Sequence, residues 1–156
     1  MIESLKSLFQ SSGSAELSLD RFNHLYKEHN EFIRKSIYWM VRADNIDDIV
    51  QETFYKAWKN RARFDSKSSY KTWIYRIAMN CCYDLIKKEK KNKCLEIENN
   101  NIHLETSTNK DLISKGLSLL KPKSREIFIL FYKFEYTQEE VAVLTGHKVG
   151  TVKSQI

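Results

Sequence analysis

The sequence contains few residues that force a polypeptide to turn: one proline and four glycines among 156 residues. Glycine supplies the backbone conformations that tight turns need, and proline ends helices and interrupts central strands. A fold of many short strands would require more of both. Apolar residues make up 42% of the chain, enough to build a core, so global disorder is not expected. These features predict an all-α fold of long helices.

In the first part of the chain, apolar residues recur at helical spacing in three stretches. The first covers residues 19–41. The second is predicted to open at Asp44 or Asn45, since either residue can cap a helix, and a polar loop at 64–69 follows it. The third covers residues 70–91. The side chains expected to form the core of this three-helix unit include Ile46, Ile49, Val50, Phe54, Ala57, Trp58, Ile74, Ile77, Ala78, Cys81 and Leu85.

The character of the sequence changes after Lys93. Residues 94–109 are polar, rich in asparagine and weakly periodic, which predicts an extended linker. A second helical unit follows, in which Pro122 suits the first turn of a new helix. The predicted organisation is two small helical domains, residues 1–93 and 110–156, joined by this linker. The core of the second is expected to include Ile127, Phe128, Leu130 and Phe131.

Positive charge is concentrated in one part of the sequence. The formal net charge is +6, but residues 54–93 contain twelve Lys or Arg against three Asp or Glu. Residues 1–53 have six against nine, and residues 94–156 have eight of each. The basic segment suits a polyanion, and the acidic segment before it indicates a different partner. The alternative is that both segments are ordinary solvated surface.

A helix-turn-helix pattern lies near the C-terminal end. Residues 137–140 form a capping-box sequence that starts a helix. Ala142, Gly146 and Val152 follow at the spacing that lets two helices approach, turn and pack. An ordinary helical hairpin would share these apolar positions. If the motif binds DNA, its second helix would offer four side chains to the major groove: Thr151, Lys153, Ser154 and Gln155.

The third helix is predicted to carry a second surface for nucleic acid. Aromatic rings can stack on unpaired bases, cations can hold phosphates and an amide can read a base edge. The serines of the preceding loop, Ser66, Ser68 and Ser69, could surround a flipped base. The alternative is that the tryptophan belongs to the core and that the lysines only match the helix dipole. The residues on this face are Trp73, Arg76, Asn80, Tyr83 and Lys87.

The sequence gives no support for catalysis. Asp47, Asp48 and Glu52 could in principle bind a metal, and a nuclease is therefore one alternative function. However, the four histidines are scattered, and no nucleophilic triad or phosphate loop is recognisable. We expect no metal, no cofactor and no enzymatic activity. Three cysteines without metal-like spacing, and no long apolar run, predict a cytoplasmic protein that is not inserted in a membrane.

Taken together, these motifs resemble the extracytoplasmic-function (ECF) group of bacterial RNA polymerase sigma factors, relatives of the housekeeping sigma factors. The resemblance rests on residues 47–58, 64–80, 120–126 and 136–154. It implies that Asp48, Gln51, Glu52 and Phe54 contact core RNA polymerase. It implies −10 promoter contacts for Lys56, Phe64, Ser68, Ser69, Trp73, Arg76, Asn80, Tyr83 and Lys87. For the −35 element it implies contacts by Thr151, Lys153, Ser154 and Gln155.

The resemblance also implies partners. These are the clamp coiled coil and the flap of core RNA polymerase, promoter DNA and an anti-sigma factor. A stand-alone DNA-binding regulator is the remaining alternative, although it leaves the acidic face of the second helix unexplained. Three departures from the family pattern stand out. Glu135 replaces a usual glycine, His147 replaces an aliphatic residue, and the chain stops at Ile156, which predicts a truncated recognition helix.

Overall fold

The computed structural model describes residues 17–41, 46–64, 67–95 and 109–156. Its regular elements are all helical, and no strand occurs within these ranges. The predicted all-α fold is therefore confirmed. The elements are α2 (Leu19–Val41), α3 (Ile46–Lys59), η1 (Arg61–Arg63), α4 (Tyr70–Leu95), α5 (Asn109–Leu119), α6 (Pro122–Phe128), η2 (Ile129–Lys133), α7 (Gln138–Thr145) and α8 (Val149–Lys153).

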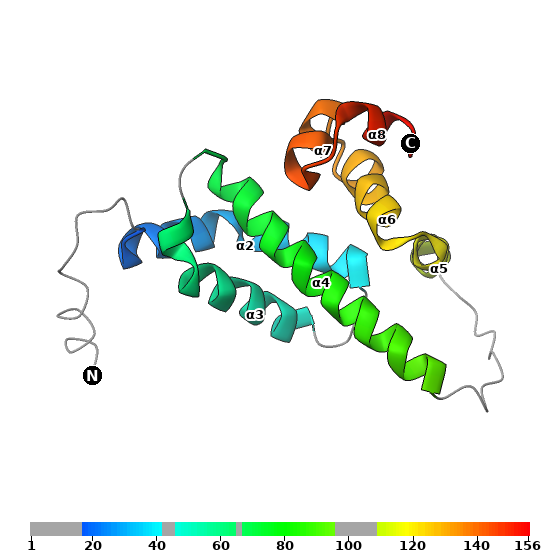
Figure 1. Ribbon diagram of the computed structural model, residues 1–156, viewed down its shortest axis with the longest axis horizontal. Helices are drawn as coiled ribbons and strands as arrows, with labels where there is room; N and C mark the ends of the chain where they lie inside the picture. The colour runs from blue at the N-terminus through cyan, green and yellow to red at the C-terminus, as the bar shows by residue number, and fades with distance from the viewer. Residues whose placement is uncertain (1–16, 42–45, 65–66, 96–108) are drawn as a thin grey trace.

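Helices α2, α3 and α4 pack together as the N-terminal unit (Figure 1). Each helix turns an apolar stripe inward, as its sequence spacing predicts. Helix α3 also has acidic residues in its first turn and lysines in its last, which complements the helix dipole. The buried threonine of α3, Thr53, satisfies its hydroxyl by donating to the carbonyl of Ile49 at 2.7 Å. Fully buried side chains in this core include Ile33, Ile37, Ala57, Ile74 and Ala78.

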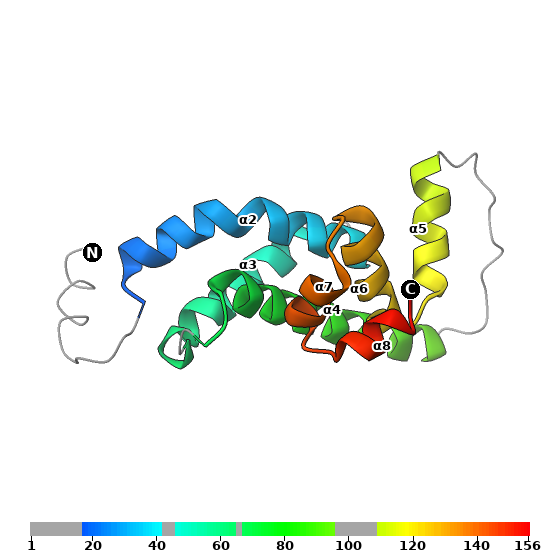
Figure 2. The same cartoon turned by 90° about the horizontal axis from the view of Figure 1, so that it is seen from above.

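Helices α5 to α8 form the C-terminal unit, in which α5 lies at the end of the molecule far from the start of α2 (Figure 2). Pro122 occupies the first turn of α6, as predicted. The chain then passes through the π-helix η2 and a turn in which Glu135 has a left-handed backbone, with φ of 57°. Gly146 ends α7 with φ of 74°. The core of this unit includes the fully buried Ile127, Leu130, Val141 and Val152.

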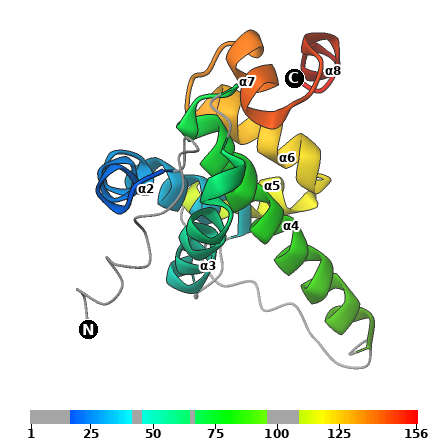
Figure 3. The same ribbon diagram turned by 60° about the vertical axis from the view of Figure 1, so that its left-hand side comes forward.

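The two units pack directly against each other. Helices α6 and α7 lie on the opposite side of α4 from α3 (Figure 3). The buried guanidinium of Arg125 joins them, since Nη1 donates to the carbonyl of Met40 at 2.8 Å and Nε donates to the carbonyl of Leu117 at 2.8 Å. The predicted linker at 94–109 lies outside the described residues except for its ends.

Candidate nucleic-acid interface and partner surface

The predicted base-reading face of α4 is only partly open to solvent. Arg76, Asn80 and Lys87 are exposed, whereas Trp73 and Tyr83 are half-buried. Their spacing of three and four residues places them along one side of the helix. The face therefore combines cations, an amide and aromatic rings, as the sequence predicts.

Trp73 belongs to an aromatic cluster at the start of α4. Its ring centroid lies 5.2 Å from that of Phe64 and 5.6 Å from that of Tyr70. Burial raises the pKa of the Tyr70 phenol well above its ordinary value, because the phenolate would lack solvation there. Trp73 and Phe64 are both half-buried, so they support the local fold and still present part of each ring at the surface.

The loop before α4 is held by a helix cap. The hydroxyl of Ser69 accepts a hydrogen bond from the backbone N–H of Thr72 at 3.1 Å, which satisfies one of the free donors of the first turn. Ser69 is exposed and Ser68 is half-buried. Ser66 lies outside the described residues. Ser69 thus has a structural role that does not depend on any ligand.

Two residues of the α4 face are bonded to the C-terminal unit. The guanidinium of Arg76 donates to the carbonyl of Val143 at 2.8 Å and to that of Leu144 at 3.2 Å. The phenol of Tyr83 donates to the carboxylate of Glu126. In this arrangement Arg76 and Tyr83 are both hydrogen-bonded within the chain, although the side chain of Arg76 is still exposed.

The acidic face of α3 is fully accessible. Asp48, Gln51 and Glu52 are exposed and lie within one turn of each other. Phe54 is different, since its side chain is only 7% exposed and its ring packs edge-on against Tyr26 at a centroid distance of 4.5 Å. We therefore correct the assignment of Phe54: it supports the helix from the core side and does not belong to the exposed contact surface.

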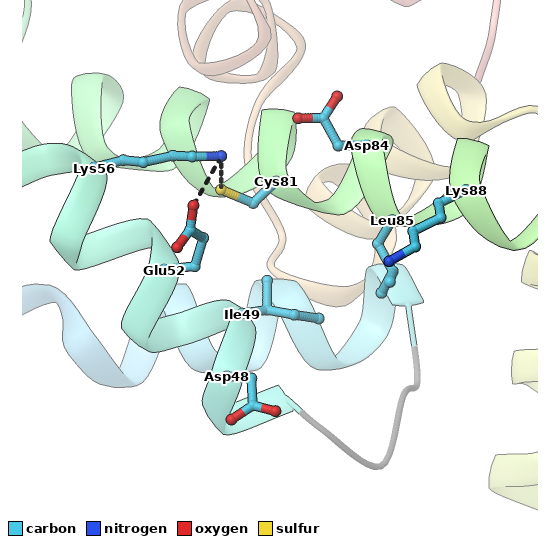
Figure 4. Close-up of a pocket in the computed structure, with 8 residues that line it drawn as sticks. All are labelled: Asp48, Ile49, Glu52, Lys56, Cys81, Asp84, Leu85 and Lys88. Carbon is cyan, nitrogen blue, oxygen red and sulfur yellow. Dashed lines mark hydrogen bonds and ion pairs between the residues drawn. The ribbon is translucent and has the colours of Figure 1, made fainter.

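A cavity of about 280 Å³ lies beside this acidic face, between α3 and α4 (Figure 4). Three of the side chains that line it are in contact: the ammonium of Lys56 lies 3.3 Å from a carboxylate oxygen of Glu52 and 3.6 Å from the sulfur of Cys81. Burial lowers the pKa of Lys56, but Cys81 and Glu52 more than offset this and raise it overall. Lys56 thus lines this cavity together with Asp48, Ile49, Glu52, Cys81, Asp84, Leu85 and Lys88.

The helix-turn-helix forms as predicted. Thr137 and Glu140 make both bonds of the capping box, since the Thr137 hydroxyl accepts from the Glu140 N–H at 3.2 Å and the Glu140 carboxylate accepts from the Thr137 N–H at 2.9 Å. Ala142 and Val152 are buried between the helices. Helix α8 ends at Lys153, so the last two predicted groove residues lie beyond it. The four predicted −35 contacts are all exposed: Thr151, Lys153, Ser154 and Gln155.

Sequence reasoning missed a second buried stripe on α4. This stripe consists of Tyr75, Met79, Cys82 and Ile86, which are all buried. They follow one another at intervals of four, three and four residues, the spacing of one helix face. Next to it, burial raises the pKa of Glu126, although hydrogen bonds from Tyr83 and Tyr75 and the charge of Lys123 oppose the shift. The helical spacing of these four residues is the sequence pattern that could have predicted the second stripe.

The described ranges contain no grouping of three or more His, Cys, Asp or Glu residues that could hold a metal ion. None of the helices in these ranges is long and apolar enough to cross a membrane.

Comparisons with known families agree with this division into two units. Residues 25–92 match the model of sigma-70 region 2, and residues 110–156 match the model of sigma-70 region 4. The first match covers most of α2 together with α3 and most of α4, and the second covers α5 to α8.

The curated relatives are sigma factors as well. The ECF RNA polymerase sigma factor SigW of Bacillus subtilis is 28% identical, over 88% of this chain and 83% of SigW. The RNA polymerase sigma factor SigV of the same species is 26% identical, over 81% and 78%. Among solved structures, the sigma factor RpoE in complex with the anti-sigma factor NepR from Bartonella quintana has a TM-score of 0.70 and 26% identity, over 88% of this chain and 91% of RpoE. The chain therefore belongs to the sigma-70 family of RNA polymerase sigma factors, in its ECF group.

Proposed function

We propose that this sigma factor, which directs RNA polymerase in transcription initiation, divides its contacts between its two units. The N-terminal unit would bind core polymerase through α3 and the −10 element through α4. The C-terminal unit would read the −35 element through α8. The observation that carries the proposal is the pair of opposed surfaces in one small unit, an exposed acidic face on α3 and a basic, aromatic face on α4.

The acidic face of α3 suits a basic or polar helix of the polymerase clamp. Asp48 and Glu52 supply carboxylates four residues apart, and Gln51 supplies an amide between them. Charges placed in this way orient an approaching partner and penalise an incorrect one. All three side chains are exposed, so docking requires no rearrangement of the N-terminal unit.

The α4 face suits single-stranded DNA of the −10 element. The ring of Trp73 can stack on an unpaired base, Asn80 can bond to a base edge, and Arg76 can hold a phosphate. Capturing exposed bases lowers the free energy of the opened duplex, so melting can draw on binding energy alone. This work would take place in the cytoplasm with the polymerase, and no cofactor or catalytic activity of the chain is needed for it.

The C-terminal unit carries exposed apolar side chains that suit a second contact with polymerase. Isolated exposed apolar residues are common, but several on neighbouring helices indicate a binding surface. We assign this surface to the polymerase flap. Its members on α5, α6 and η2 are Leu112, Ile113, Leu119, Phe128 and Tyr132.

An anti-sigma factor is the fourth proposed partner. The solved relative from Bartonella quintana is bound to the anti-sigma factor NepR, and its match covers 88% of this chain. A protein that covered either face of the N-terminal unit would stop polymerase docking or promoter contact.

The docking role is tested by Asp48→Ala and Glu52→Ala. Each variant should weaken binding to core RNA polymerase by about tenfold, because each removes one close charge contact. Binding can be measured by fluorescence anisotropy of the labelled full chain. Glu31→Ala is the matched control, since Glu31 is an exposed carboxylate on α2 in a surface ion pair with Lys35. Equal affinities for all three variants would disprove the assignment.

The −10 role is tested by Asn80→Ala. The variant should lose selectivity for the −10 sequence by about tenfold while its affinity for core polymerase is unchanged, since the lost amide bonds belong to base recognition. The readout is transcription in vitro with core polymerase and a promoter library. Asn23→Ala on the exposed side of α2 is the control. If Asn80→Ala weakened polymerase binding to the same degree, the residue would be structural.

A further inference from the structure

Helix α4 continues well beyond the core of the N-terminal unit. Its last buried residue among those described is Ile86, and the helix runs on to Leu95. This end of α4 extends past α3, and no other described helix lies beside it (Figures 1 and 3). Residues 87–92 include no apolar side chain and all of them are exposed. Packing therefore does not explain why the helix continues here.

This stretch is strongly basic, and we call residues 87–92 the lysine extension. Four of its six residues are lysines, and Glu89 is its one acidic residue. None of the four ammonium groups forms an ion pair or hydrogen bond with another described residue. Lysines four residues apart on a helix repel each other, as Lys87 and Lys91 do. A helix that only needed to be solvated would instead combine charges of both signs.

The helix dipole does not account for these lysines. The favourable interaction of a cation with the C-terminal end of a helix falls off within the last turn. Lys87 and Lys91 lie eight and four residues before the end of α4 at Leu95. Because most of the extension lies before the last turn, an external negative charge explains the cluster better.

The lysine extension continues the face of α4 that we assign to the −10 element. Asn80, Lys87 and Lys91 are spaced by seven and four residues, which places them along one side of the helix. Lys90 borders the same side, three residues after Lys87. Lys88 is directed elsewhere, because it lines the cavity between α3 and α4. The proposed base-reading face thus passes directly into a row of exposed cations.

The extension lies beyond the bases that Asn80 can reach. Lys91 follows Asn80 by eleven residues, or about 16 Å of helix. A duplex rises about 3.4 Å per base pair, so a helix laid along DNA would place Lys91 about five base pairs away. Trp73, which we assign to unpaired bases, lies toward the other end of α4. The DNA on the side of the extension is therefore the paired DNA that leads to the −35 element.

We propose that the lysine extension binds the phosphate backbone of the duplex between the −10 and −35 elements, through Lys90 and Lys91 and without reading its sequence. This proposal rests on the proposed −10 role of α4. Phosphate contacts position a protein on DNA and carry no sequence information, so the extension sets affinity while Asn80 sets selectivity. Each lysine that neutralises a phosphate also releases counterions, which makes the affinity depend on salt.

The test variant combines Lys90→Gln with Lys91→Gln in the full chain. Glutamine has nearly the helix propensity of lysine, so the variant loses two charges and keeps the helix. The matched control combines Lys27→Gln with Lys35→Gln, because both lysines are exposed on α2 and the change in net charge is identical. Circular dichroism melting checks that both variants are folded.

The first readout is the salt dependence of promoter binding. Core RNA polymerase carrying the chain is titrated onto a labelled promoter duplex, which the wild type has selected from the promoter library. The α4 variant should reduce the slope of log affinity against log salt concentration by about two and weaken binding by about fivefold. The α2 variant should match the wild type. An unchanged slope for the α4 variant, or an equal reduction for the α2 variant, would overturn the proposal.

The second readout locates the contact on the DNA. Methylphosphonate linkages between the two elements remove the charge of the phosphates and leave the bases unchanged. The wild type should bind this neutral DNA about fivefold more weakly, whereas the α4 variant should lose almost nothing further, as a double-mutant cycle requires of a direct contact. A full loss in both proteins would overturn the proposal. So would weaker binding of the α4 variant to core polymerase without DNA, since the extension would then contact the polymerase.

The −10 role of α4 is measured separately by the selectivity of Asn80→Ala on the promoter library. If Asn80→Ala lost selectivity while neutral DNA affected wild type and α4 variant equally, the −10 role would stand and the lysine contact would fail. If Asn80→Ala kept its selectivity while the two readouts gave the expected results, the −10 role would fail and the lysine contact would stand.

Discussion

Glu135 is the only non-glycine residue in the described ranges with a left-handed backbone, at φ of 57°. The conformation costs an L-residue about 1 to 2 kcal/mol relative to its preferred regions. It reverses the chain after η2, so that Phe134 and Tyr136 both reach Phe32. The departure from glycine noted in the sequence therefore leaves the turn in a glycine-like shape and stores strain at the contact between the units.

We predict that Glu135→Gly stabilises the protein by about 0.5 to 1 kcal/mol. Glycine removes the strain but gains freedom in the unfolded chain, so the net effect is smaller than the strain alone. Urea denaturation followed by circular dichroism measures the change. The same substitution in a helix, Glu139→Gly, should destabilise the protein by about 1 kcal/mol. Changes of the same sign in both variants would contradict the strain at position 135.

At the scale of an element, α7 shows how a short helix is defined by its ends. It has eight residues, too few for a stable isolated helix. Thr137 and Glu140 satisfy donors at its start, Gly146 ends it, and Arg76 binds two carbonyls of its last turn. Hydrogen bonds from Thr137 also lower the pKa of Glu140. The reading motif thus depends on both ends being capped.

We predict that Thr137→Ala destabilises the protein by about 1 kcal/mol, the usual value for loss of an N-cap. Thermal unfolding measures the change, and Thr151→Ala, which alters an exposed threonine on α8, should have little effect. Because the folded state lowers the pKa of Glu140, its contribution is present above the ordinary glutamate pKa and is lost as the pH falls through the lowered value. The difference between Thr137→Ala and the wild type should therefore shrink in acid. A difference that grew in acid would contradict the capping box.

Helices α4 and α7 also show how far the sequence alone can predict this protein. The capping box, the turn glycine and the start of α4 at Tyr70 carry local signals, and all of them were predicted correctly. The second buried stripe of α4 was not predicted, because it begins at Tyr75, and tyrosine is a residue type that also occurs at surfaces. Phe54 was assigned to the partner surface on family resemblance, although its apolar spacing already indicated the core.

At the scale of the whole molecule, the contact between the two units could not be predicted from the sequence. The polar stretch at 94–109 predicted two units on a tether and gave no information on their contact. Arg76 binds backbone carbonyls, which leave no pattern in the side chains of α7. The carboxylate of Glu126 looks in the sequence like any surface glutamate, and only its contact with Tyr83 explains its burial.

The contact between the two units should depend on pH through Glu126. Its pKa is raised mainly by burial at this contact, and the groups facing it are Tyr75, Tyr83 and Cys82 of α4 and Lys123 of α6. A raised pKa means that the contribution of Glu126 to this contact is fully present below the ordinary glutamate pKa and is lost as the pH rises through the raised value. We predict a smaller radius of gyration at pH 5 than at pH 8. Glu126→Gln, which stays neutral and can still accept a hydrogen bond, should abolish this difference, and persistence of the difference would assign it to another group.

The bonds between Arg76 and the carbonyls of α7 have a consequence for how such a protein can diverge. A backbone carbonyl is the same whatever side chain its residue carries, so substitutions on the outer surface of α7 and at α8 leave these bonds in place. Promoter preference could thus drift over generations while the contact between the units is inherited unchanged. Gly146 is the exception, because its backbone φ of 74° favours glycine and a side chain there would strain the turn beside Arg76.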